Sequence, residues 1–143
     1  MRSRRLADGG ARTFVLIFEA GDEVVAGVEG FAAEQAITAA SLQGIGAFSD
    51  VLLGFFERDS RDYRRIPIDE QVEVLALLGD VALADGRPKL HAHVVVGKRD
   101  GSAHGGHLLA AHVWPTLEVV LVDAPDRLQR VHDAASGLAL IRP

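Results

Sequence analysis

The sequence predicts an α+β domain in which one main helix packs on a central, mostly antiparallel and twisted sheet. Short runs of β-branched and aromatic residues alternate with turns that contain Gly, Asp or Pro, as in sheets built from short connections. Only one long segment places its apolar residues at helical spacing. The 143 residues, of which 48% are hydrophobic, contain no repeat, linker or low-complexity stretch. They therefore suit a single domain with a buried core.

The N-terminal part of the chain predicts a strand followed by the main helix. Residues 1–12 are polar and rich in arginine, so we expect a flexible basic leader or an edge strand there, and a single domain over residues 13–143. The apolar run 13–18 predicts a strand. Asp22 is expected to cap the helix, whose apolar stripe begins at Val24.

The rest of the chain predicts a series of strands. Their expected ranges are 37–43, 48–57, 63–68, 71–83, 90–97, 104–113, 116–122 and 138–141. Gly44 and Gly46 interrupt the pattern between the first two of these strands, which predicts a bulge or bend. In the fourth strand we expect Val72 and Leu78 to share one face. Pro125 is expected to begin a short helix.

Composition excludes several classes of protein. The chain has no cysteine, which rules out disulfides and thiolate zinc sites and leaves His, Asp and Glu as metal ligands. The absence of cysteine agrees with a reducing compartment, and we expect a cytoplasmic protein. No apolar run reaches the length of about 18 residues that a membrane-spanning helix needs. The net charge of −5 opposes binding to nucleic-acid phosphates.

The strongest functional signal is a set of three histidines around one predicted hairpin. His91 and His93 are two residues apart on a strand, so both side chains point to the same face. If the hairpin folds about Asp100, His93 pairs with His107, and paired residues share a face with Cβ atoms about 5 Å apart. The three imidazoles then converge through local geometry alone. Three His ligands with an open fourth position are typical of a catalytic-type zinc site.

Other interpretations of these histidines remain open at this stage. A two-residue loop would shift the pairing by one and turn His107 to the opposite face, and a bulge at Gly105 or Gly106 would reset the register. Strand histidines also make ordinary hydrogen bonds, and imidazole ligands suit nickel, copper or iron as well as zinc. We expect the remaining histidines to lie outside the cluster: His104, His112 and His132.

Two carboxylates, Glu73 and Glu118, stand inside apolar runs. A buried ionised Glu costs several kcal/mol unless it is paired or bound to a metal. If either carboxylate faces the metal, it is a candidate catalytic general base. The commoner alternative is a position at a strand edge or in an ion pair with an arginine.

Apolar residues on both faces of the strand 104–113 favour self-association. We expect Leu109 and Ala111 on the face of His107, and Leu108 on the other face. One helix cannot cover both faces of such a sheet, so a second subunit is expected to cover the remainder.

A series of short motifs occurs in the order typical of a known family. They are Gly44-Ile45-Gly46-Ala47, Leu53-Gly54-Phe55-Phe56, Glu73-Val74-Leu75, Leu78-Gly79-Asp80, Asp85-Gly86-Arg87-Pro88, His91-Ala92-His93, Asp100-Gly101, Gly105-Gly106-His107-Leu108 and Thr116-Leu117-Glu118-Val119. Through these motifs the chain resembles the PPC ("plants and prokaryotes conserved") domain family over roughly residues 12–142. The combination of a His-x-His pair, Gly-Gly-His and Thr-x-Glu is the most specific part of the resemblance.

The resemblance implies a PPC-like α+β fold assembled as a homotrimer. It also implies zinc as the cofactor, with one ion per subunit bound by His91, His93 and His107. In the plant members, an AT-hook with the sequence Arg-Gly-Arg-Pro precedes the domain and binds the minor groove of AT-rich DNA. This sequence contains no such element, so DNA is a disfavoured partner.

Together, these observations favour a trimeric zinc-binding domain with a ligand-binding or regulatory role toward an unidentified small molecule. A DNA-binding protein is the first alternative. A metal-dependent enzyme acting on a small molecule, with Glu73 or Glu118 as its base, is the second. An enzyme is less expected because the sequence shows no recognisable nucleophile or phosphate-binding loop.

Overall fold

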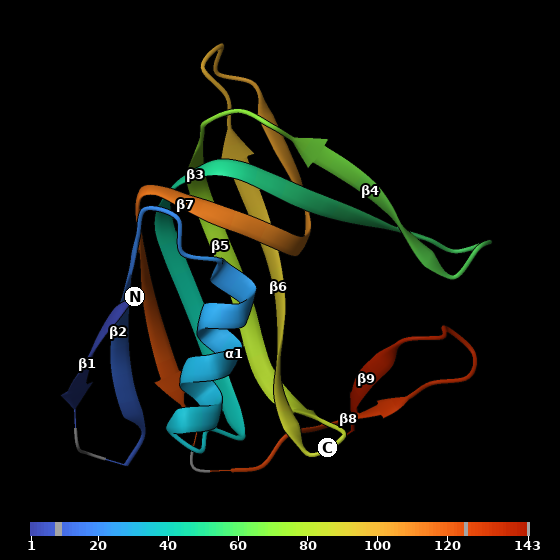
Figure 1. The fold of residues 1–143 in the computed structure, drawn as a ribbon. Helices are drawn as coiled ribbons and strands as arrows, with labels where there is room; N and C mark the ends of the chain where they lie inside the picture. The colour runs from blue at the N-terminus through green and yellow to red at the C-terminus, as the bar shows by residue number, and fades with distance from the viewer. Residues whose placement is uncertain (8–9, 125, 143) are drawn as a thin grey trace.

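The computed structural model describes residues 1–7, 10–124 and 126–142. These residues form a mostly-sheet domain with one helix and a nine-stranded sheet (Figure 1). The elements are β1 (Arg2–Ala7), β2 (Arg12–Glu19), α1 (Val24–Glu34), β3 (Ala39–Glu57), β4 (Asp62–Ile68), β5 (Val72–Ala84), β6 (Arg87–Gly97), β7 (Ala103–Asp123), β8 (Gln129–His132) and β9 (Ala139–Arg142). Within the described residues, no helix is long and apolar enough to span a membrane.

The sheet is a twisted, nearly all-antiparallel assembly whose central strands pair in a circuit. The main strand order is β1-β2-β7-β3-β5-β8-β9, with β4 paired to β3 and β6 paired to both β5 and β7. Strands β3, β5, β6 and β7 therefore each pair with two others of the same four. The exception to antiparallel pairing is the contact of Leu83 in β5 with Gln129 in β8. The predicted mostly antiparallel sheet is confirmed.

The helix α1 packs on the sheet and closes the core (Figure 1). Val24, Val28 and Phe31 are buried on one side of the helix, as the apolar stripe predicted. Gly27 allows the close approach, because a Cβ atom there would lie 2.5 Å from a ring carbon of Phe18. The N-cap is Glu23 rather than the predicted Asp22, since the Glu23 carboxylate accepts the hydrogen bond from the Ala26 N–H.

Two long strands replace pairs of predicted shorter ones. Strand β3 is continuous, and its register shifts between Gly44 and Gly46, which confirms the predicted bulge. Strand β7 is also continuous and passes through the cis peptide bond between Trp114 and Pro115. The predicted ends of the shorter strands were wrong because bulges and bends keep the ladder pairing across the interruptions.

Irregular register also changes which side chains face the core. In β5 the register shifts between Val74 and Ala76, so Val72 and Leu77 are buried whereas Leu78 is 60% exposed. The prediction that Leu78 shares the face of Val72 was therefore wrong. The β3–β7 register also shifts between Ala110 and Leu108. As a result Leu108 and Ala111 are both buried, although they were expected on opposite faces of the strand. One added residue reverses the alternation of a strand.

The two ends of the chain add edge strands. Arg2–Ala7 form β1, which pairs with β2. Of the two expected arrangements, a flexible leader or an edge strand, these residues adopt the edge strand. The predicted short helix after Pro125 is wrong for the described residues, because Gln129–His132 form strand β8 and pair with β9. Asp8, Gly9, Pro125 and Pro143 lie outside the described residues.

Candidate metal centre

The site lies where strand β7 changes its pairing partner. Residues 103–107 of β7 pair with β6, and from His107 onward the strand pairs with β3, beginning at Gly54. His107 is therefore the last residue paired to β6. Its direct partner on β6 is His93, which confirms the predicted register. The connection between β6 and β7 includes the Lys98–Gly101 turn, in which the Gly101 N–H donates to the Lys98 carbonyl.

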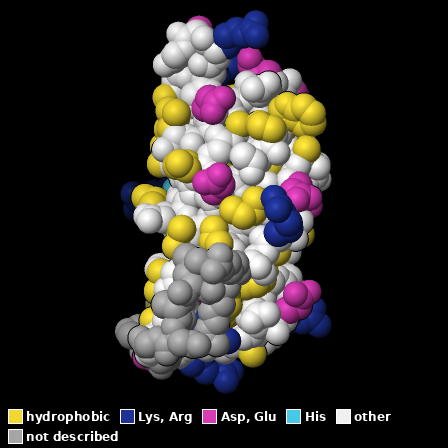
Figure 2. Space-filling view, turned by 90° about the vertical axis from the view of Figure 1, so that its left-hand side faces the viewer, with side chains coloured by type: hydrophobic (Ala, Val, Ile, Leu, Met, Phe, Trp, Pro, Cys, Tyr) yellow, Lys and Arg dark blue, Asp and Glu magenta, His cyan; other side chains and the backbone are white. Residues whose placement is uncertain are grey.

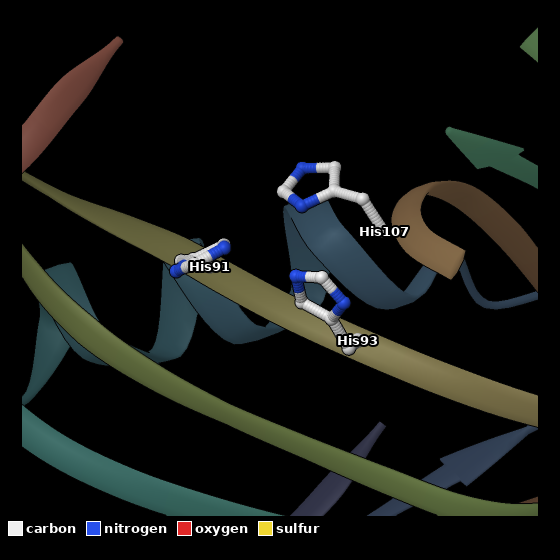
Figure 3. Close-up of side chains that lie close together, drawn as sticks. All are labelled: His91, His93 and His107. Atoms are coloured by element: carbon white, nitrogen blue, oxygen red, sulfur yellow. The ribbon is translucent and has the colours of Figure 1, made fainter. Parts of the chain in front are cut away.

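The register brings the three imidazoles together on one side of the sheet. Each ring offers one nitrogen to a set in which all three lie within 4.8 Å of one another. The ring centroids are 5.3 Å apart for His91 and His93, 5.2 Å for His91 and His107, and 5.5 Å for His93 and His107. Figure 3 shows the three rings gathered around a common space, with His91 and His93 projecting from β6 and His107 approaching from β7.

His107 is the most buried of the three histidines. Its Nδ1 atom is buried and has no hydrogen-bond partner among the described residues. Burial, together with the neighbouring charges of His91, His93 and Arg130, lowers the pKa of His107 to about 4. Tyr63 of β4 stacks on this ring with a centroid distance of 4.7 Å. The imidazole is therefore neutral near pH 7, fixed in orientation, and has a free lone pair available to a metal.

His91 is flanked by two charged residues that the sequence did not point to. The Asp80 carboxylate lies 3.7 Å from His91 Nδ1, and Arg130 of β8 forms an ion pair with the same carboxylate. Burial lowers the pKa of His91, and the positive charge of Arg130 adds to this effect. A carboxylate beside the non-ligating nitrogen of a histidine is the usual device for orienting a metal ligand.

The two carboxylates predicted as general bases are not brought to the histidines. Glu73 lies between buried Val72 and Val74, and Glu118 lies between buried Leu117 and Val119. Alternation therefore turns both carboxylates away from the core, and both are exposed. They line a shared groove of about 590 Å³ with Ile45, Leu75 and Thr116, outside the histidine cluster.

The other histidines also lie outside the cluster, as expected. His112 pairs with Asp50 at 2.8 Å between Nδ1 and Oδ1. His104 is exposed near the start of β7, and His132 is exposed on β8, where a helix surface had been expected. The candidate centre therefore consists of three imidazoles, with Asp80, Arg130 and Tyr63 around them.

This arrangement fits a divalent metal ion. Three neutral imidazoles are a common ligand set for zinc and other late first-row metals, and three protein ligands leave a coordination position for a further group. The unpartnered, buried His107 Nδ1 supports this fit, because a sheltered polar atom without a partner is costly unless a ligand satisfies it.

Comparison with known proteins places the chain among domains of the same fold. The family model described as the Plants and Prokaryotes Conserved (PCC) domain matches residues 5–125. A plant- and prokaryote-conserved (PPC) protein from Pyrococcus horikoshii has a TM-score of 0.87 and 30% identity, with 96% of this chain and 98% of that chain covered. A comparison with curated proteins finds no match.

Two further solved structures bear on the site. A metal-containing protein from Archaeoglobus fulgidus has a TM-score of 0.86 and 30% identity, with 100% of this chain and 99% of that chain covered. A candidate DNA-binding protein from Bacteroides thetaiotaomicron has a TM-score of 0.88 and 28% identity, with 98% of this chain and 96% of that chain covered. The similarity extends over nearly the whole length of each chain.

Proposed function

Because this chain belongs to the Plants and Prokaryotes Conserved domain family, we propose that it is a homotrimeric domain that binds one zinc ion per subunit and serves a ligand-binding or regulatory role. The ion would be held by His91, His93 and His107, whose donor nitrogens lie within 4.8 Å of one another. The observation that supports this proposal most directly is this convergence, together with the unpartnered His107 Nδ1. The metal-containing relative from Archaeoglobus fulgidus gives independent support.

The residues around the triad suit a binding centre. A bound zinc ion would supply an electrophilic position for a polar or anionic group. His107 is kept neutral by burial, and Tyr63 holds its ring in place. The Asp80 carboxylate lies beside His91, and Arg130 in turn forms an ion pair with Asp80.

Self-association is supported by apolar side chains on the sheet face away from the helix. Ile45, Leu75 and Leu78 are each more than half exposed, and they lie on the neighbouring strands β3 and β5. They line shallow grooves with Val120 and Glu118 of β7. Figure 2 shows hydrophobic side chains scattered over one side of the molecule, with acidic and basic side chains among them. Subunit contacts would remove such a surface from water.

Duplex DNA is a second candidate partner, because a relative from Bacteroides thetaiotaomicron is described as a candidate DNA-binding protein. The net charge of −5 opposes it, since the attraction of phosphates to lysine and arginine supplies most of non-specific affinity.

The zinc proposal is tested by the metal content of protein purified without added metal. We expect about one equivalent of zinc per chain by elemental analysis, as the triad requires. His91→Ala and His107→Ala should lose most of this metal, because each removes one of three ligands. His104→Ala is the matched control on the same hairpin and should retain it. Substoichiometric metal that does not fall in His91→Ala would contradict the proposal.

A further inference from the structure

A small open pocket adjoins the histidine triad and is bordered on its far side by the β8–β9 hairpin. Its volume is about 180 Å³. The walls combine His91 and His107 of the triad with Tyr63, Arg130, Leu138 and Leu140. The cavity therefore connects the candidate metal centre with a segment of the chain that is far away in sequence.

Arg130 is the unusual residue of this cavity. Its side chain is only 8% exposed, so a permanently charged guanidinium is nine-tenths buried. Two of its nitrogens have partners, Asp80 and, at 3.5 Å, the carbonyl oxygen of Ala139. Its Nε atom is buried and has no partner among the described residues. A buried charged donor without a partner is costly, and an anion in the adjoining pocket would stabilise the guanidinium through its charge.

The charges around the cavity favour an anion. The single negative charge of Asp80 cancels the positive charge of Arg130. The imidazoles are neutral ligands, so a divalent ion on the triad would leave about two uncompensated positive charges in the site. The ammonium of Lys89, at the rim, is already paired with Glu29 at 3.2 Å.

The size and the walls of the pocket indicate the character of the rest of the ligand. The volume of about 180 Å³ suits a small ligand. Leu90, Leu138 and Leu140 provide apolar wall on the side of the β8–β9 hairpin. A short hydrocarbon chain therefore matches this side, and a charged head group matches the side of Arg130 and the triad.

We propose that this cavity binds a small aliphatic monocarboxylate, whose carboxylate contacts both the metal ion on the triad and the Arg130 guanidinium. This inference rests on the metal site proposed above, and it names the ligand class of that site. Carboxylates are preferred to phosphates because the cavity offers one guanidinium and apolar walls, whereas a phosphate needs donors on several sides.

The test uses butyrate as the probe and butyramide, which has the same shape without the charge, as its control. Binding to the zinc-loaded full chain is measured by titration calorimetry, and the cobalt-substituted protein reports through its visible absorption spectrum. We expect butyrate to bind and to change the cobalt spectrum, and butyramide to do neither. Zinc stoichiometry is measured in the same samples.

Substitutions of Arg130 and of Leu138 test the role of the guanidinium charge and the role of the apolar part of the pocket. Arg130→Gln should weaken butyrate binding by at least about 10-fold, as expected for the loss of a charge-assisted contact, whereas Arg99→Gln, in the exposed β6–β7 turn, should not. Because Arg130→Gln leaves Asp80 unpaired, the double variant Asp80→Asn/Arg130→Gln should show the same loss. Leu138→Trp fills the cavity and should weaken butyrate more than formate.

The outcomes separate this inference from the zinc proposal. If zinc is bound but butyrate and butyramide behave alike, or if Arg130→Gln binds butyrate normally, the carboxylate site is wrong and the metal site stands. If the triad binds no metal, the zinc proposal itself fails. Butyrate binding of equal strength to the His91→Ala variant would also overturn the inference, because it would show a site independent of the metal.

Discussion

Two histidines of strand β7 lie five positions apart in sequence and meet opposite environments. His107 is half-buried, and burial together with the charges of His91, His93 and Arg130 lowers its pKa to about 4. His112 is exposed, and its hydrogen bond with Asp50 raises its pKa above the ordinary value of 6.5. The first remains a neutral metal ligand candidate at neutral pH, whereas the second takes part in a surface ion pair. Environment, rather than residue type, determines the role of each.

The His112–Asp50 pair predicts a pH-dependent contribution to stability. The folded-state pKa of His112 lies above its unfolded value, so the contribution is complete below about pH 6.5 and is lost as the pH rises through the folded pKa. The pair is largely exposed, so its contribution is about 0.5 kcal/mol. We expect the free energy of unfolding of His112→Gln to differ from the parent by this amount near pH 5.5 and to converge with it near pH 8.5. Urea denaturation measures both values.

His104→Gln provides the control for this experiment, because His104 is exposed on the same strand outside the ion pairs described by the structure. Its difference from the parent should be the same at both pH values. A His112→Gln deficit that grows with pH would contradict the predicted direction.

The residues of the centre differ in how far the sequence could predict them. His91, His93 and His107 follow from strand alternation and one hairpin register, which are local properties. Asp80 was missed, although the tight turn between β5 and β6 pairs it directly with His91 and so contains the signal. Arg130 and Tyr63 had no such signal, because their positions depend on where β8 and β4 meet the rest of the sheet.

At the scale of elements, the bulge in β3 allows one strand to cross the domain. Gly46 has φ +153°, and a Cβ atom there would lie 2.3 Å from the Thr116 carbonyl oxygen of β7. The two backbones are therefore in contact at the bulge. Only glycine satisfies both the close approach and the dihedral angle.

Gly46→Ala should accordingly destabilise the domain by about 3 kcal/mol or more, because it combines backbone strain with an overlap that only a shift of β7 relieves. Thermal or urea denaturation measures the loss. Gly101→Ala is the matched control, since Gly101 also has positive φ but has open space where its Cβ would lie. Its cost should be near 1 kcal/mol, the value of the dihedral penalty alone. Equal losses in the two variants would show that the contact with β7 does not matter.

Sequence patterns predicted the type of most elements but not their continuity. Periodicity predicted the helix and the main strands, because the core selects one face of each. The apolar spacing of 128–135 also fits a helix, but Gln129–His132 pair with β9, and such pairing depends on tertiary contacts that no local pattern contains. The faces of Leu78 and Leu108 were missed for the same reason, since a bulge is fixed by the partner strand.

At the scale of the whole molecule, the apolar sheet face determines the predicted assembly. Leu78 is 60% exposed on β5 and lies within the proposed subunit contact. Leu78→Glu places a charge in that contact, and a buried unpaired charge costs several kcal/mol. We expect size-exclusion chromatography with light scattering to show a trimer for the parent and a monomer for this variant.

The control for assembly introduces the same charge elsewhere. Ala33→Glu alters an exposed position of helix α1, and this variant should remain trimeric. The parent chain eluting as a monomer, or Leu78→Glu remaining a trimer, would contradict the assigned contact face.

The order of the strands also shows which edges of the sheet are open to edge-to-edge aggregation. Its two outermost strands are β1 and β9, and β4 pairs only with β3. All three contain arginine: Arg2 in β1, Arg64 and Arg65 in β4, and Arg142 in β9. Charged side chains on edge strands disfavour strand-to-strand stacking and fibril formation. Arg2 and Arg142 also form ion pairs, with Glu19 and Asp133. The molecule thus has charged, hydrated edge strands, while its apolar sheet face remains available for a closed assembly.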